Sequence, residues 1–258
     1  MDIVTLLSLI FSIIALILAF VLDGGVLSAL LEPTAALIVF GGTFGAIGMS
    51  FSSKDLAKIP KLLALAFRKK KQSREELLTY FDSISTMVRK EGLLSLEGKM
   101  NEDKNMDPFL VSGLQMVVDG IDIDEVKETL ENRIMNMQQR HEKGIGIFEA
   151  AGGYAPTMGV LGTVMGLVHV LGDLSRPDEL GGKIAIAFIA TLYGVGSANL
   201  IWLPIASKLK ELDADETITK YMMLDGITMI QRGSNPRLIA ERLEGYLDYE
   251  NAKEEIRK

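Results

Sequence analysis

The chain has 258 residues, of which 48% are hydrophobic and 24% charged, and its formal net charge is −7 at pH 7. A negative charge of this size opposes contact with nucleic acid, so nucleic acid is not an expected partner. The sequence contains no cysteine, which excludes disulfides, thiolate chemistry and cysteine-based metal sites.

Four segments are each long and apolar enough to cross a bilayer, and none contains Asp, Glu, Lys or Arg: Ile3–Leu22, Pro33–Ser53, Ala150–Gly172 and Ile184–Ser207. A spanning helix needs about 20 mainly apolar residues, and in hydrocarbon only helices and closed barrels satisfy their own backbone hydrogen bonds. The first segment has no basic region before it and no clear cleavage site, so we expect a spanning helix instead of a signal peptide. The sequence predicts an all-α membrane protein with four transmembrane helices.

The polar segments define the rest of the predicted architecture. Residues 54–149 separate the second span from the third, and residues 208–258 follow the fourth. Lys and Arg gather directly after the second and fourth spans, at Lys54, Lys58, Lys61, the run 68–71, Lys208 and Lys210. Positive residues stay in the cytoplasm. We therefore expect a large helical cytoplasmic domain, a helical cytoplasmic tail and cytoplasmic N- and C-termini, in a multi-pass protein of the bacterial inner membrane.

The polar segments carry helical periodicity throughout, with no alternating strand pattern. The predicted helices are Arg74–Lys90, Leu93–Met100, Asp107–Gly120, Asp122–Glu142 continuing into the third span, and a last helix from Asn235 to Leu247. Gly92 is the expected cap of the first helix. Asp107 and Asn235 are expected N-caps, each followed by proline at the first helical position. Asp122 and Glu125 have the spacing of a capping box.

Small residues recur at steps of three and four along two spans, and therefore on one face of each. They are Pro156, Gly159, Thr163 and Gly166 in the third span, and Ala187, Thr191, Gly194 and Ala198 in the fourth. Gly162 with Gly166, and Gly41 with Gly45, add two further patterns that allow helices to approach closely. Two interpretations stay open. The faces serve ordinary helix packing, or the hydroxyls of Thr163 and Thr191 line an ion pathway, because a hydroxyl can exchange protons or coordinate a desolvated cation.

Pro156 lies inside the third span, where it removes one backbone hydrogen bond. This predicts either a static kink or a point of flexing.

No catalytic motif accompanies these residues: the sequence has no HExxH, no Gly-x-Ser-x-Gly and no phosphate-binding loop. His141 and His169 lie on different predicted segments, one solvated and the other interfacial or a proton relay. We expect neither an enzyme nor a bound cofactor or metal.

The motifs together resemble one known family. They are Gly41-Gly42-Thr43-x-Gly45-Ala46 in the second span, Ala155-Pro156-x-x-Gly159-x-x-Gly162-Thr163-x-x-Gly166 in the third, and Gly233-x-Asn235-Pro236-Arg237 in the tail. With four spans and a large second cytoplasmic segment, the chain resembles the flagellar motor stator subunits of the MotA, PomA and MotP family over nearly its whole length. ExbB and TolQ are distant relatives, and they usually have three spans.

The resemblance implies roles for particular residues. Arg89 and Glu97 would occupy the two charged positions that engage the rotor protein FliG; without the family they fit a solvated helix–turn–helix. Pro156 and Pro236 would couple ion passage to movement of the cytoplasmic part. Thr163 stands where sodium-type relatives commonly have a hydroxyl, while residues 164–169 are closer to proton-type sequences. The translocated ion is therefore H⁺ or Na⁺, with a slight preference for sodium.

The spans lack a carboxylate, which an ion crossing a membrane needs. The chain is therefore an incomplete conductor. The resemblance implies a MotB-like partner whose single transmembrane helix carries the missing Asp, and a homopentamer of this chain around a partner dimer. Two alternatives are an ExbB/TolQ-like subunit that energises outer-membrane processes and a non-conducting membrane scaffold.

Overall fold

The structure is a computed structural model, and it describes residues 3–67, 73–102, 106–172 and 177–247. Every regular element within these residues is a helix, which confirms the predicted all-α class. Four helical segments are long and apolar enough to span a membrane, as predicted. The basic run 68–71, part of the second hairpin loop and the end of the tail, all used in the sequence-based predictions, lie outside the described residues.

The chain divides into two compact units. Unit 1 consists of residues 1–69 and 141–212, and unit 2 of residues 70–140 and 213–258. Unit 1 therefore holds all four predicted spans together with both ends of the segment 54–149. Unit 2 combines the middle of that segment with most of the tail, although the two stretches are far apart in sequence.

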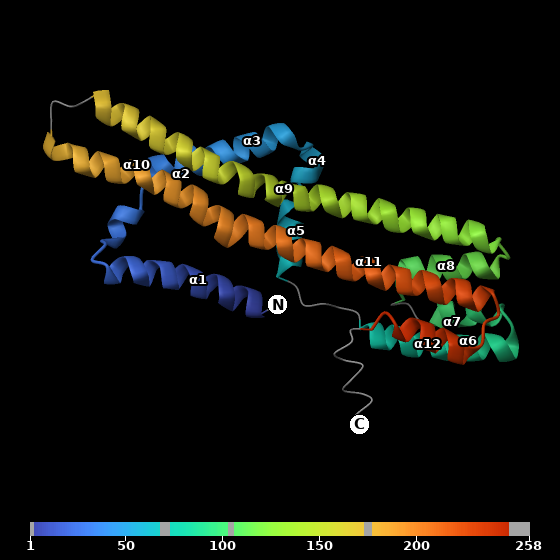
Figure 1. Cartoon of the computed structure of the whole chain (residues 1–258). Coiled ribbons are helices and arrows are strands. Elements are labelled where there is room, and N and C mark those ends of the chain that lie inside the picture. The colour runs from blue at the N-terminus through green and yellow to red at the C-terminus, as the bar shows by residue number, and fades with distance from the viewer. Residues whose placement is uncertain (1–2, 68–72, 103–105, 173–176, 248–258) are drawn as a thin grey trace. The chain divides into compact units, whose positions relative to one another are not determined.

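Unit 1 begins with α1 (Ile3–Leu22) and the short 3₁₀ helix η1 (Leu27–Leu30). The second span consists of α2 (Pro33–Ala36), the π-helical segment η2 (Leu37–Gly41) and α3 (Gly42–Ser50), followed by α4 (Ser53–Leu56) and α5 (Ile59–Ala66). The third span is the end of α9 (Ile123–Gly172). The fourth consists of α10 (Pro177–Ser197) from Ile184 onward, the π-helical segment η3 (Ala198–Trp202) and the start of α11 (Leu203–Gln231), and α10 runs beside α9 (Figure 1).

The second span is shorter than its apolar sequence suggests. Its helix ends at Ser50, because Phe51 has an extended backbone and Ser52 begins the next helix. The Ser52 hydroxyl accepts a hydrogen bond from the N–H of Asp55 at 3.3 Å, which is an N-cap contact. The predicted end at Ser53 is therefore wrong, since a capping serine starts a new helix where composition alone continues the old one.

The lipid-facing surface of unit 1 is strongly apolar. Along α1, large side chains such as Val4 and Phe11 are exposed, at 72% and 73%. Exposed apolar side chains of this density are unfavourable in water, but they cost nothing in hydrocarbon. Tyr193 of α10 holds the segment that leads into α2, since its hydroxyl donates to the Leu30 carbonyl and accepts from the Glu32 N–H.

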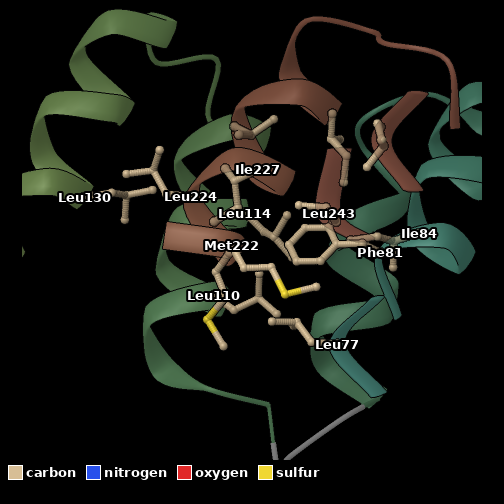
Figure 2. Packing of buried hydrophobic residues seen from close by; sticks show 14 of the residues in the cluster. Leu77, Phe81, Ile84, Leu110, Leu114, Leu130, Met222, Leu224, Ile227 and Leu243 are labelled. Carbon is tan, nitrogen blue, oxygen red and sulfur yellow. The ribbon is translucent and has the colours of Figure 1, made fainter. Parts of the chain in front are cut away.

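Unit 2 is a helical domain with a dense hydrophobic core. It contains α6 (Arg74–Glu91), α7 (Ser95–Glu102), α8 (Pro108–Val118), the first part of α9, most of α11, and α12 (Pro236–Glu244). Leu77, Phe81 and Ile84 of α6 meet Leu110 and Leu114 of α8 and Met222, Ile227 and Leu243 of α11 and α12 (Figure 2). At Gly226 the ring of Phe81 fills the space that a side chain would need.

Buried charges in unit 2 are paired, as burial requires. Arg74 is only 7% exposed, and its guanidinium binds Asp215 and donates to the Tyr246 carbonyl. Lys220 lies 2.6 Å from Asp107 and 5.4 Å from the centre of the Phe109 ring. These pairs fix the C-terminal part of the chain to α6 and α8 by polar contacts in addition to the apolar core.

The helix boundaries in unit 2 follow most of the predicted caps. Gly92 ends α6 with φ +86°, and the Asp107 and Asn235 side chains accept backbone N–H groups at the starts of α8 and α12. Two expectations need correction. Asp122 accepts from the N–H of Asp124 instead of Glu125. The last helix ends at Glu244, at a turn closed by Gly245, so it does not reach Leu247.

Candidate functional site

The third and fourth spans approach so closely that glycine is required at their contact. A Cβ built on Gly159 would lie 2.8 Å from the Ala190 carbonyl oxygen of α10, and one built on Gly194 would collide with the Ala155 carbonyl of α9. Gly159 and Gly194 also lie directly opposite each other. Because backbone atoms have no freedom to turn aside, these two positions fix the shortest separation between α9 and α10.

The contact continues toward the end of α9. A Cβ on Gly162 would lie 2.7 Å from the Cβ of Ala190, and one on Gly166 would lie 2.6 Å from the Cβ of Ala187. The small-residue faces predicted from the sequence therefore do meet, glycine of one helix against alanine of the other. This is the close packing that drives helix association in membranes, where the hydrophobic effect contributes little.

Gly41 and Gly45 behave differently. Both are exposed, and no described residue of another helix lies within 4 Å of a Cβ built on either. The packing glycine of the second span is Gly42, where a Cβ would lie 2.7 Å from the Met158 sulfur of α9. Gly41 and Gly45 therefore pack against no other helix among the described residues, because η2 and α3 present the neighbouring face to α9.

Two hydroxyls lie in the middle of the α9–α10 contact. Thr163 Oγ1 and Thr191 Oγ1 are 2.6 Å apart, and both side chains are half-buried. Thr163 also lies within hydrogen-bonding distance of the carbonyls of Ala187, at 2.9 Å, and Gly159, at 3.2 Å, while Thr191 lies 3.4 Å from the Gly159 carbonyl. Each hydroxyl has one proton and can accept two hydrogen bonds. The protons can therefore redistribute among these partners.

The hydroxyl site carries no charge of its own. Its four oxygens come from two hydroxyls and two carbonyls, and none of the four spans contains an acidic residue. Neutral oxygens suit hard cations, but they are normally joined by a carboxylate when the ion has lost its water. The site can therefore relay a proton or help to coordinate a desolvated cation. It cannot neutralise that cation alone.

Pro156 lies in α9 one turn before Gly159 and has no N–H to donate to the carbonyl of Gly152. A second interruption of the helical backbone hydrogen bonds, in the fourth span, was not predicted from the sequence. Pro204 follows η3 and has no N–H for the carbonyl of Leu200, which lies inside that π-helical segment. π-helical turns are often found at functional sites. Proline within the fourth apolar segment was the sequence signal that could have revealed this irregularity.

The remaining candidate residues lie in unit 2 or at the ends of the spans. Arg89 is exposed near the end of α6, and Glu97 is exposed in the first turn of α7. Pro236 opens α12 at the first helical position. The His141 and His169 side chains are separated by more than seven turns of α9. Within the described residues no group of three or more metal-binding side chains is found.

Two hydrogen-bonded groups outside the spans, Asp55 and Tyr246, have clearly shifted pKa values, and both serve the fold. A hydrogen bond from Lys58, followed by one from Ser52, lowers the pKa of the exposed Asp55 carboxyl. Burial, followed by a hydrogen bond to Asp225, raises the pKa of Tyr246 to about 12. Tyr246 lies 2.8 Å from Asp225, and Arg242 lies 3.1 Å from the same carboxylate. These contacts secure the end of α12 against α11.

Comparison with known proteins gives consistent matches over the whole chain. The family model for the motility protein A N-terminal region matches residues 6–92, and the model of the MotA/TolQ/ExbB proton channel family matches residues 101–222. Motility protein A of Bacillus subtilis is 38% identical over 248 residues, which cover 96% of this chain and 91% of that protein. Chemotaxis protein PomA of Vibrio alginolyticus is 36% identical, with 96% of each chain covered.

A solved structure has the same fold. The flagellar MotAB stator complex from Bacillus subtilis contains a chain that matches with a TM-score of 0.91 and 36% identity, covering 97% of this chain and 98% of that one.

Fold and site together define a helical membrane protein with four spans, in which a carboxylate-free hydroxyl site lies between two closely packed helices. The chain belongs to the MotA/TolQ/ExbB proton channel family, and motility proteins of the MotA and PomA type are among the relatives that it matches over nearly their full length.

Proposed function

We propose that this chain is a stator subunit of a bacterial flagellar motor, which conducts ions together with a MotB-like partner and converts the ion-motive force into torque on the rotor. The observation that carries the proposal is the hydroxyl pair Thr163–Thr191, 2.6 Å apart, in spans that contain no acid. The full-length similarity to motility proteins and to chains of MotAB complexes supports the same function.

The roles of this chain and of its partner follow from the charges that each contributes. The partner supplies a carboxylate on its single transmembrane helix, and this chain supplies the hydroxyls and carbonyls around it. When the carboxylate binds the ion, the pair becomes neutral and the cost of placing it in hydrocarbon falls. Each elementary charge that crosses about 100 mV releases roughly 2.3 kcal/mol. That energy is available per ion to move one subunit against another.

We propose H⁺ or Na⁺ as the ion, with a slight preference for Na⁺. Thr163 brings a second hydroxyl to the site of Thr191, and two carbonyls lie within reach. Neutral oxygen donors can coordinate a hard cation such as Na⁺, which is the basis of the slight preference. No cofactor is required for either ion.

The assembly we propose is a homopentamer around a partner dimer in the inner membrane, with both termini of this chain in the cytoplasm. Lys54, Lys58 and Lys208 after the spans support that orientation. Gly41 and Gly45 are exposed within the chain, which suits contact with a helix of a neighbouring subunit.

On the cytoplasmic side, Arg89 and Glu97 engage the rotor protein FliG through their charges. Both are exposed, and steering by exposed charges changes association more than stability. Pro156 and Pro236 couple ion passage to movement of the cytoplasmic part, the first by a missing hydrogen bond within a span and the second by starting α12.

Reconstitution in liposomes tests the conducting role. The chain alone is expected to show no ion flux, and the chain with its partner to show flux that depends on the partner's Asp. Replacing Na⁺ by K⁺ at constant pH should abolish ion flux through a sodium-driven complex and leave flux through a proton-driven complex unchanged. Flux through the chain alone would overturn the proposal. Conduction without rotor torque in cells would favour the ExbB/TolQ-like alternative, and no conduction with the partner would favour a scaffold.

A further inference from the structure

A groove of about 670 Å³ lies in unit 1 between α1 on one side and η3 with the start of α11 on the other. Its walls are mainly apolar, with Leu9 and Ile13 from α1, Leu63 from α5, and Leu200 and Ile205 from the fourth span. The groove is partly open to its surroundings. Thr5, Ser8, Ser12, Asn199 and Ser207 also line the groove, but most of its wall is apolar, which makes an apolar chain a better filling than water.

The groove has the length of one lipid leaflet. Its lining on α1 extends from Val4 to Ile13. Nine residue steps cover about 13 Å along a helix, close to half of a hydrocarbon core of roughly 30 Å. An acyl chain that entered beside the first residues of α1 would therefore reach the middle of the bilayer by the end of the groove.

One end of the groove carries opposite charges side by side. Lys208 and Glu211 both line it, on successive turns of α11, and Lys208 Nζ lies 3.0 Å from the Glu211 carboxylate. The Lys208 side chain is 24% exposed and the Glu211 side chain 71%. These residues follow the last apolar residues of the fourth span, so they lie at the depth of lipid head groups. Among the described residues, the groove thus combines an apolar body with a charged end at which Lys208 and Glu211 balance each other.

We propose that this groove binds a phospholipid with an ethanolamine head group from the cytoplasmic leaflet, the leaflet being set by the proposed orientation. One acyl chain lies between α1 and the fourth span. The lipid phosphate accepts a hydrogen bond from Lys208, and the lipid ammonium donates to Glu211. The head group thus completes two charge-assisted hydrogen bonds with a matched pair of opposite charges.

The charge pattern selects among head groups. Phosphatidylcholine has no N–H to donate to Glu211, because its nitrogen carries three methyl groups. Phosphatidylglycerol has a phosphate for Lys208 but no cation for Glu211. The hydroxyls of phosphatidylglycerol offer Glu211 only neutral donors, whereas a head group with both a phosphate and an ammonium group gives each side chain a charge-assisted hydrogen bond. The bound lipid fills the space beside α1, which otherwise contacts the fourth span mainly through η3.

The test uses the full-length chain, purified in mild detergent and supplied with phosphatidylethanolamine, phosphatidylcholine or phosphatidylglycerol in equal amounts. Native mass spectrometry counts the lipids retained by each chain as detergent rises. One phosphatidylethanolamine molecule per chain is expected to stay bound at detergent concentrations that remove the other two lipids. Lys208→Gln should weaken its retention about ten-fold, the typical effect of losing a hydrogen bond to a charged group. Lys210→Gln, which removes a charge outside the groove, should leave retention unchanged.

Filling the groove gives an independent test. Ser12 lines the groove, while Ile14 lies on α1 outside it and is exposed. Ser12→Phe should abolish the retained lipid, and Ile14→Phe should keep it. Equal retention of all three lipids, or unchanged retention in Ser12→Phe, would overturn the proposal. A cross-link from Ser8→Cys to a second copy of the chain, formed in place of lipid retention, would also overturn it. None of these measurements depends on ion flux or torque. The lipid proposal can therefore fail while the proposed motor function holds, and the reverse.

Discussion

The Thr163 and Thr191 hydroxyls meet at 2.6 Å across the contact of α9 and α10, although 28 positions separate them in the chain. Gly159 and Gly194 bring the two helices close enough for this contact. The polar and the steric parts of the site therefore depend on each other, since a wider helix separation would part the hydroxyls.

Removing the hydroxyl of Thr191 separates an ion role from a packing role. Thr191→Val keeps the volume, so assembly with the partner should stay normal while motor torque falls strongly. The measurement is the speed of tethered cells together with membrane levels of the complex. Thr157→Val is the matched control, because the Thr157 hydroxyl is exposed and bonds to the Tyr154 carbonyl of its own helix. A fully motile Thr191→Val strain would show that the hydroxyl serves packing only.

Gly194→Ala should disrupt the helix contact itself. The added methyl would meet the Ala155 carbonyl, which cannot move aside without separating α9 from α10. Overpacking of this kind typically costs about 1–3 kcal/mol. We expect a lower melting temperature of the detergent-solubilised chain and weaker assembly. Gly196→Ala is the control, since a Cβ there would meet no described atom of another helix within 4 Å. Equal melting temperatures for the two variants would contradict the close approach.

Restoring the backbone donor in α9 tests the coupling role of Pro156. Pro156→Ala supplies the N–H that the Gly152 carbonyl lacks, so the helix should become stiffer and the free energy of unfolding should rise or stay level. If flexing couples ion passage to movement, flux through the complex should persist while torque is lost. Flux in liposomes and cell rotation together measure this. Normal rotation in the Pro156→Ala strain would show that Pro156 forms only a static kink.

Charge reversal tests the proposed rotor contact. Arg89→Glu or Glu97→Lys should impair motility while the protein still inserts and assembles, because exposed charges typically contribute only about 0–1 kcal/mol to stability. Complementary charge reversal on FliG should restore part of the swimming. As controls, Lys127→Glu and Glu128→Lys change exposed charges of α9. If the Arg89 and Glu97 variants fail to assemble, these residues serve the fold and the rotor contact lies elsewhere.

Alkaline titration should expose the role of Tyr246 in unit 2. Its pKa is raised from 10.0 to about 12, first by burial and then by the hydrogen bond to Asp225. When folding raises the pKa of a group, that group stabilises the folded state fully at any pH below its pKa in the unfolded state. This contribution is lost as the pH rises through its pKa in the folded state. Stability should therefore decline between about pH 10 and 12, and less steeply in Tyr246→Phe.

The ultraviolet absorbance of tyrosinate measures this titration. The difference between wild type and Tyr246→Phe isolates the one group, and Tyr221→Phe, at a more exposed position on α11, provides the comparison. An ordinary pKa for the group lost in Tyr246→Phe would contradict the contact with Asp225.

The sequence by itself determined the features that depend on local chemistry. Apolar length predicted the four spans. The caps at Gly92, Asp107 and Asn235 were predicted because a capping residue acts on backbone groups within a few positions. The small-residue faces of α9 and α10 followed from helical periodicity, and the missing carboxylate from composition alone.

Only the tertiary structure decided which faces meet. Spacing placed Gly41 and Gly45 on a packing face, yet Gly42 meets Met158, because the rotation of a helix about its axis depends on its neighbours. The pairing of Thr163 with Thr191 and the union of residues 213–247 with α6 and α8 likewise join distant segments. Such contacts depend on how ridges of side chains fit into grooves across helices, and local periodicity does not specify that fit.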